Sequence, residues 1–324
     1  MVHVIRFHET GGPEVLRWEE VDLGKPGQGE VRIRHTAVGL NFVDTYQRSG
    51  LYPMPMPSPL GGEGAGVIEE VGPGVTDLKV GDRVAYGSAP LGAYSEARLI
   101  PAARLVKIPD GISDQTAAAM MLKGLTTEYL VNRSYNIQKG DTVLFHAAAG
   151  GVGLIFGQWA KAKGATVIGT VGGAAKAKLA RDHGYDHVID YNKEDFVARV
   201  GEITNGAKCP AVYDGVGKDT FMKSLDCVRP HGFVISFGQA SGKIPPVDLG
   251  ILAAKGSLYV QRPTLQTYGA KREDLVAMAK NLFDVVLSGK VKIVVSQTYP
   301  LKDAAKAHAD LEARKTTGST VFVV

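Results

Sequence analysis

Short apolar or alternating runs, separated by Gly, Pro and Asp, fill the first 120 residues of the chain. They predict strands at residues 2–7, 30–40, 65–71, 83–86 and 93–100. Several short strands at this spacing favour a barrel or sandwich over a parallel sheet. Residues 51–59 hold four prolines in nine positions, so we expect a stiff loop there, of the kind that often borders a site.

The pattern changes near Ile112. Residues 113–132 have helical periodicity, with Ser113 or Asp114 as the expected N-cap. From residue 142 onward strands and helices alternate, which predicts a doubly wound parallel sheet. The expected strands are 142–145, 166–170, 187–190, 211–214, 233–236 and 257–260, and the expected helices are 152–163, 174–183, 194–204 and 218–227. After Arg262 we expect a helix at 273–288, a strand, a helix at 302–314 and a last strand at 320–324.

The sharpest local signal is the glycine-rich stretch at residues 147–153. It lies between a predicted strand and a predicted helix, where such a loop binds a dinucleotide pyrophosphate. Ala148, Gly150 and Gly153 occupy the three small-residue positions of the G-x-G-x-x-G pattern. Gly150 would let the backbone approach the pyrophosphate, and Gly153 would let helix and strand pack closely.

The choice of nicotinamide cofactor depends on charge. Enzymes that use NAD place an acid about 20 residues after the loop, where it binds the ribose hydroxyls. Residues 167–176 contain no acid, and the first one is Asp182. Lys176 and Tyr191 are instead available to a 2′-phosphate, so the sequence predicts NADPH.

Composition sets the broad class of the chain. Its 324 residues are 44% hydrophobic and 22% charged, which is typical of a globular protein of about two domains. The net charge of +4 and the lack of a dense basic run make nucleic acid an improbable main partner. No apolar run is long enough to span a membrane, and with two cysteines, Cys209 and Cys227, we expect a cytoplasmic protein without disulfides.

No group of His, Cys or acidic residues has the spacing of a metal site, and no nucleophile motif such as G-x-S-x-G is present. The predicted chemistry is therefore hydride donation to a positioned acceptor, with a proton source and no metal.

Ordered motifs along the whole chain resemble the medium-chain dehydrogenase/reductase superfamily, and most of all its zinc-independent NADPH:quinone oxidoreductase branch. These motifs are GLNFVD (39–44), GLYP (50–53), GGEGAG (61–66), VGDRV (80–84), KGLT (123–126), AAAGGVG (147–153), YDGVG (213–217) and SFG (236–238). Where zinc-dependent relatives carry ligands, this chain has Asn41 and Gly62, the latter just before Glu63. The resemblance therefore argues against zinc-dependent alcohol oxidation.

The resemblance implies an α/β fold in which a Rossmann domain, a doubly wound parallel sheet, is inserted into a GroES-like β-barrel catalytic domain. The expected boundaries are 1–124 and 263–324 for the catalytic domain and 125–262 for the Rossmann domain. The resemblance also implies a homodimer in which the last Rossmann strand, near residues 257–260, pairs with its copy.

Site residues follow from the same resemblance. The residues expected beside the acceptor are Asn41, Tyr46 and Tyr52. The residues expected to bind NADPH are Asn41, Thr126, Gly150, Gly151, Val152, Gly153, Gly172, Gly173, Lys176, Tyr191, Phe237, Gly238 and Arg314. His146 and Glu63 are better interpreted as buried structural groups than as catalysts.

The function implied is NADPH-dependent reduction of a quinone bound in the cleft between the domains, with Asn41 or Tyr46 polarising the acceptor oxygen and water or Tyr52 delivering the proton. One alternative is a reductase of α,β-unsaturated aldehydes or ketones. Another is an NADPH-binding protein whose role is RNA binding or structural.

Overall fold

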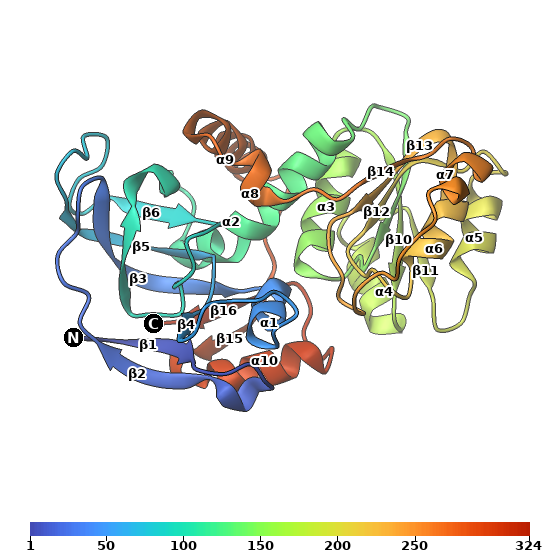
Figure 1. Cartoon of the computed structure of the whole chain (residues 1–324). Coiled ribbons are helices and arrows are strands. Elements are labelled where there is room, and N and C mark those ends of the chain that lie inside the picture. Colours follow the sequence, from blue (N-terminus) through green and yellow to red (C-terminus); the bar gives the residue numbers. More distant parts are fainter. The chain divides into compact units, whose positions relative to one another are not determined.

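The computed structural model describes residues 1–324, which divide into two compact units. The first unit comprises Met1–Leu125, Gly269–Phe283 and Ile293–Val324, and the second comprises Thr126–Tyr268 and Asp284–Lys292. Both termini therefore belong to the first unit (Figure 1). No helix is both long and apolar enough to cross a bilayer.

A seven-stranded sheet forms the centre of the first unit. Its order is β15–β16–β3–β5–β6–β8, with β7 also on β3, and only the β15–β16 pair is parallel. A small antiparallel sheet, β2–β1–β4, completes the unit. The strands are β1 (Val2–Phe7), β2 (Arg17–Val21), β3 (Glu30–Leu40), β4 (Ser58–Pro59), β5 (Gly64–Val71), β6 (Arg83–Tyr86), β7 (Ala97–Pro101), β8 (Val106–Lys107), β15 (Val295–Pro300) and β16 (Ser319–Val323).

Alternation along β3 explains its place in this sheet. Val31 and Ile33 are fully buried, whereas Arg32 and Arg34 between and after them pair with Glu69 of β5. One face of the strand therefore packs in the core while the other carries ion pairs, as a half-buried antiparallel strand requires.

Four helices contribute to the first unit: α1 (Phe42–Arg48), α2 (Asp114–Tyr129), α9 (Arg272–Leu287) and α10 (Ala304–Glu312). Ser113 caps α2, since its hydroxyl accepts the backbone N–H of Thr116 at 3.1 Å. Helix α2 starts in the first unit, ends in the second and continues as a π-helical turn, Leu130–Ser134. Single 3₁₀ turns are η1 (Pro13–Val15), η2 (Ala102–Arg104) and η5 (Leu301–Asp303).

The second unit contains the predicted parallel sheet, which the structure confirms. Its strands lie in the order β11–β10–β9–β12–β13–β14, and every pair is parallel. They are β9 (Thr142–His146), β10 (Thr166–Val171), β11 (His187–Asp190), β12 (Cys209–Asp214), β13 (Val228–Ser236) and β14 (Tyr259–Gln261). The helices are α3 (Gly151–Ala162), α4 (Ala174–Arg181), α5 (Phe196–Ile203), α6 (Phe221–Ser224) with η4 (Leu225–Cys227), α7 (Gly250–Ala254) and α8 (Leu265–Tyr268).

Helices cover both faces of this sheet, with α3 on one side and α5 and α6 on the other (Figure 1). Phe145 of β9 packs against Phe156 of α3, with ring centroids 4.4 Å apart. On the opposite face Leu144 joins Phe196 of α5 and Phe221 of α6 in one apolar cluster. The strand residues are therefore buried on both faces, which is why the strands have continuous apolar sequences.

Several predicted element boundaries differ from those of the structure, and several short elements were not predicted. The elements that were not predicted are β2, β4, β8, α1, α7 and α8. Strand β7 starts at Ala97 and not at residue 93, because residues 93–96 form a turn in which Ala93 and Tyr94 donate to Gly61 and Leu60. Helix α1 has only seven residues, too few to show helical periodicity, and β2 is largely exposed.

Candidate active site

The turn between β9 and α3 carries the predicted phosphate loop. Gly150 is the N-cap of α3, and Gly151 and Val152 form its first turn, where backbone N–H groups have no acceptor within the helix. A Cβ atom at Gly153 would lie 2.5 Å from the carbonyl oxygen of Ala148. Only glycine therefore lets α3 begin so close to β9, and the helix N-terminus fits an anionic phosphate.

A second group of predicted cofactor residues meets at the end of β10. Gly173 has a φ of 101°, and a Cβ at Gly172 would lie 2.7 Å from the hydroxyl of Tyr191. Tyr191 is 44% exposed, and Lys176 stands in the first turn of α4. The Tyr191 phenol thus lies beside a stretch of backbone without side chains, and Lys176 follows this stretch by three residues. This arrangement fits a ribose with a 2′-phosphate.

An acid also reaches this position, from a part of the chain that the sequence argument did not consider. The Asp190 Oδ1, at the end of β11, accepts the backbone N–H of Gly173 at 3.0 Å and that of Asn192 at 3.2 Å. Asp190 therefore serves the turn, with this oxygen already bonded to two backbone donors.

The end of β13 places Phe237 and Gly238, the residues expected beside the nicotinamide ribose. A Cβ at Gly238 would lie 2.6 Å from the carbonyl oxygen of Gly215, so the two strand-end turns touch through backbone. Arg262 holds this turn, since its guanidinium donates to the carbonyl oxygens of Ser236 and Gly238, each at 2.9 Å. Arg262 was not predicted from the sequence, because it follows Gly238 by 24 positions and Ser236 by 26 and belongs to no motif.

Two further residues predicted to bind the cofactor, Thr126 and Arg314, belong to none of these turns. Thr126, 7% exposed on α2, hydrogen-bonds the side chain of Tyr129, whose ring stacks on Tyr268 with centroids 4.7 Å apart. Arg314 follows α10 in the first unit, is exposed and has a φ of 59°.

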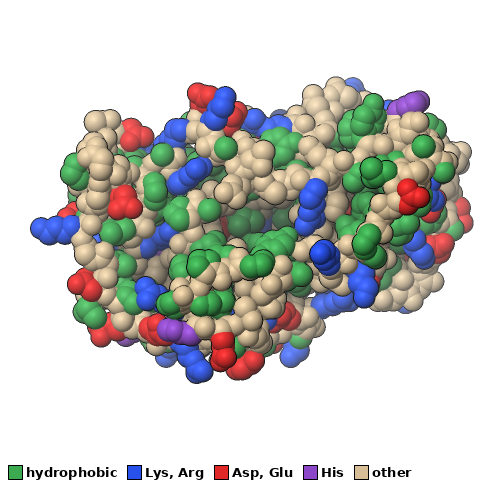
Figure 2. Space-filling view, viewed as in Figure 1, with side chains coloured by type: hydrophobic (Ala, Val, Ile, Leu, Met, Phe, Trp, Pro, Cys, Tyr) green, Lys and Arg blue, Asp and Glu red, His purple; other side chains and the backbone are tan.

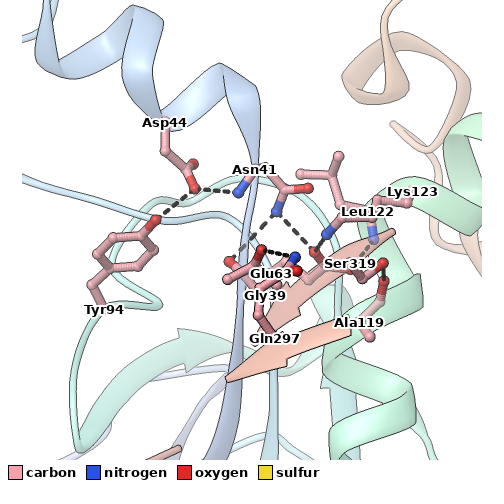
Figure 3. A network of polar contacts seen from close by, with 11 residues as sticks. Gly39, Asn41, Asp44, Glu63, Tyr94, Ala119, Leu122, Lys123, Gln297 and Ser319 are labelled. Atoms are coloured by element: carbon pink, nitrogen blue, oxygen red, sulfur yellow. Dashed lines mark hydrogen bonds and ion pairs between the residues drawn. The ribbon is translucent and has the colours of Figure 1, made fainter. Parts of the chain in front are cut away.

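In the first unit Asn41 belongs to a buried polar cluster (Figure 3). Asn41 is the N-cap of α1 and is 5% exposed. Its Nδ2 donates to Glu63 Oε2 at 2.8 Å, and the same oxygen accepts from Lys123 Nζ at 2.8 Å. The other carboxylate oxygen accepts the backbone N–H of Leu122 at 2.8 Å. Glu63 is fully buried with these partners, in agreement with its interpretation as a structural carboxylate.

Asp44 extends this cluster. Its Oδ2 accepts the backbone N–H of Asn41 and the hydroxyl of Tyr94, both at 2.9 Å, while its buried Oδ1 has no hydrogen-bond partner (Figure 3). Burial raises the pKa of Asp44 to about 7, although these two hydrogen bonds and the Lys123 charge lower it and the Glu63 charge adds to the rise. A carboxyl group in this position is partly protonated at neutral pH.

A chain of hydrogen bonds fixes the donor in the Tyr94 contact. Arg48 Nη1 donates to His308 Nδ1 at 3.1 Å, so Nε2 carries the proton and donates to the Tyr94 oxygen at 3.0 Å. Burial lowers the pKa of His308 to about 3, with the Arg48 charge acting in the same direction, so the imidazole is neutral. Tyr94 in turn donates to Asp44.

The two tyrosines expected at the acceptor lie together after Asn41. Tyr46, on α1, is 8% exposed, and its ring meets that of Tyr52 edge-on with centroids 5.3 Å apart. The backbone N–H of Tyr52 donates to the Tyr46 carbonyl at 3.0 Å. Helix α1 therefore positions Asn41, Tyr46 and Tyr52 as one group.

His146 is the buried core histidine that the sequence favoured. It is fully buried, and its two ring nitrogens bond Thr170 at 2.9 Å and Ser224 at 3.0 Å. Burial lowers its pKa, against the effect of the Asp214 charge. No group of three or more His, Cys, Asp or Glu side chains has the geometry of a metal site.

Comparison with known proteins agrees with this architecture. An alcohol dehydrogenase GroES-like domain matches residues 27–110, and a zinc-binding dehydrogenase domain matches residues 151–283. The chain is 56% identical to a quinone oxidoreductase of Pseudomonas aeruginosa, over 100% of both chains. The chain belongs to the quinone oxidoreductase family of the medium-chain dehydrogenases/reductases. The predicted family and the predicted combination of Rossmann and GroES-like folds are thereby confirmed.

Other members of this family are also similar over their full length. The crystal structure of Escherichia coli quinone oxidoreductase complexed with NADPH matches with a TM-score of 0.98 and 50% identity, over 99% of this chain and 100% of that one. A 2-haloacrylate reductase of a Burkholderia species is 46% identical, over 100% of this chain and 99% of the relative.

Proposed function

We propose that this chain is an NADPH-dependent quinone reductase. The observation that carries the proposal is the glycine-built N-terminus of α3, together with full-length similarity to quinone oxidoreductases. Bound NADPH supplies the hydride. The chain's own contribution is binding and orientation, which account for much of the rate in such reactions.

Residues of the second unit would hold the cofactor. The first turn of α3, at Gly151 and Val152, meets the diphosphate, and Lys176 with Tyr191 meets the 2′-phosphate. Phe237 and Gly238, held by Arg262, support the nicotinamide half.

Residues of the first unit would hold the acceptor. Tyr46 and Tyr52 give an aromatic surface for a flat quinone, and the Tyr52 hydroxyl or a water molecule provides the proton. We assign this catalytic role to a domain made of residues 1–124 and 263–324, and cofactor binding to residues 125–262. The division of the chain into two compact units supports this assignment.

A test of this function is stopped-flow oxidation of NADPH by the purified chain with a panel of quinones and conjugated enones. We expect rapid turnover with quinones and much slower turnover with NADH as donor. Faster reaction with the enones would reassign the acceptor, and no reaction with any of them would overturn the proposal.

We also propose a homodimer that forms through β14. This strand is at the edge of the six-stranded sheet, and Tyr259 and Val260 on it are 56% and 41% exposed. An exposed apolar edge strand is protected when it pairs with a second copy. Sedimentation of wild type and Val260→Lys tests this, because a dimer through β14 should dissociate in the variant.

The proposed location is the cytoplasm, and the state of the two cysteines supports it. Cys209 and Cys227 are both buried and unpaired, as is usual in a reducing compartment.

On the face drawn in Figure 2, Lys and Arg side chains are interspersed with Asp and Glu, unlike the continuous basic track of a nucleic-acid-binding surface.

A further inference from the structure

The orientation of the Asn41 amide is determined by its neighbours. The Glu63 carboxylate only accepts hydrogen bonds, so the atom of Asn41 that lies 2.8 Å from it must be the nitrogen. The same nitrogen points its second hydrogen toward the carbonyl oxygen of Gly39 at 3.5 Å. In Figure 3 the amide oxygen points away from Gly39. Asn41 can therefore meet a ligand only as an acceptor, through Oδ1.

Glu63 is itself held in place from several directions. Lys123 and the Leu122 backbone N–H bind its two oxygens, and both Glu63 and Lys123 are buried. A Cβ at Gly39 would lie 2.2 Å from Glu63 Oε2 and 2.3 Å from the carbonyl oxygen of Ala118. The Glu63 carboxylate and the Ala118 carbonyl thus fill the space that a side chain at position 39 would need.

We propose that Glu63, held by Lys123, is a positioning residue that makes Asn41 an obligatory hydrogen-bond acceptor, and that Asn41 Oδ1 receives an N–H or O–H group of the nicotinamide half of NADPH. A quinone oxygen is also an acceptor, so Asn41 would have to break its bond to a buried carboxylate before it could polarise that oxygen. The inference rests on the proposed function for the identity of the cofactor.

A double-mutant cycle on NADPH affinity tests the coupling, with Kd measured by fluorescence titration. The variants are Asn41→Ala, Glu63→Gln and the double variant. Glutamine has one acceptor oxygen in place of two, so it cannot serve Leu122, Lys123 and Asn41 together. We expect each single change to raise Kd about tenfold and the double change to raise it no more than Asn41→Ala does. Additive effects, about a hundredfold in the double variant, would overturn the proposal.

Glu69→Gln is the matched control, since Glu69 lies on the exposed side of β5 and pairs with Arg32 and Arg34. Its Kd should equal that of wild type. If wild type binds NADPH but turns over no quinone, only the proposed function fails. If wild type does not bind NADPH, both fail.

A cofactor analogue identifies the donor group. In the 3-acetylpyridine analogue of NADPH a methyl group replaces the carboxamide NH2. If the carboxamide is the donor, Asn41→Ala loses its effect on Kd with the analogue, whereas a ribose hydroxyl donor leaves the effect intact. A variant that raises only the quinone KM, with Kd for NADPH unchanged, contradicts the proposal.

Asn41→Asp provides a second test if Glu63→Gln does not fold. The new carboxylate would face Glu63, and two such groups ionise together only at a large cost. We therefore expect NADP+ affinity to fall as pH rises and to recover at lower pH, where the pair shares a proton. A pH profile equal to that of wild type would refute the positioning role of Glu63.

Discussion

The two groups of predicted site residues, one in each unit, are built in opposite ways. In the second unit the phosphate turn consists of backbone and missing side chains, all within seven consecutive residues, 147–153. In the first unit the cluster around Asn41 consists of buried ionisable side chains, Asp44, Glu63 and Lys123, which come from separate segments of the chain (Figure 3).

This difference has a physical consequence. A backbone site fails when a single carbon is added, because the atoms that it would strike are carbonyl oxygens that cannot rotate away. A buried charge cluster fails when its charge balance changes, because an uncompensated buried charge is costly. The phosphate turn should therefore be sensitive to the size of an added side chain, and the cluster around Asn41 should be sensitive to protonation.

Gly153→Val should have the largest effect. The added carbons would meet the carbonyl oxygen of Ala148 at 2.5 Å and force α3 away from β9. We expect the free energy of unfolding to fall by about 3 kcal/mol and NADPH binding to be lost. Urea unfolding and fluorescence titration measure the two effects.

Gly201→Ala is the control for that change. Gly201 lies within α5, and a Cβ there would meet nothing within 4 Å. The variant should gain about 0.5–1 kcal/mol, because alanine favours a helix over glycine. Equal stability of the two variants would show that the phosphate turn does not depend on the absence of a side chain.

The second prediction concerns Asp44 and pH. Burial raises its pKa from 3.8 to about 7, so the folded state favours the protonated form. The stability that this proton gives is complete below about pH 4 and is lost as pH rises through 7, at about 1.4 kcal/mol per unit. Asp44→Asn, which stays neutral, should therefore gain about 2–3 kcal/mol relative to wild type between pH 5 and pH 8.

Urea unfolding at both pH values measures this difference. The amide oxygen of the variant can still accept from Asn41 and Tyr94, which share one carboxylate oxygen in wild type. Asp219→Asn, at an exposed position, serves as the control and should show no such change. If wild type and Asp44→Asn respond to pH in parallel, Asp44 does not titrate between these pH values.

The contrast between the two groups also explains what the sequence could predict. The phosphate turn was located because its signal is local: a strand, small residues and a helix follow one another directly. The other members of the Asn41 cluster were not predicted, because Glu63 and Lys123 lie 22 and 82 positions from Asn41 and come together with it only in the fold. Arg262 and Asp190 were also not predicted, because each contacts a turn that lies many positions away in the sequence. Helix α1, which carries Asn41 and Tyr46, was missed because seven residues are too few to show periodicity.

The smallest predicted effect concerns Lys176, the charged side chain that is expected to bind the cofactor in the second unit. Lys176→Ala should raise the KM for NADPH about tenfold and leave that for NADH unchanged, because only NADPH carries the 2′-phosphate that the ammonium group would pair with. Lys178→Ala is a matched control on the same helix, since Lys178 is 79% exposed and pairs with Asp182. Steady-state kinetics with both cofactors separates the two variants. An equal rise for NADPH and NADH would mean that Lys176 supports α4 and not the phosphate, and the cofactor preference would then have to come from Tyr191 and the backbone around Gly172.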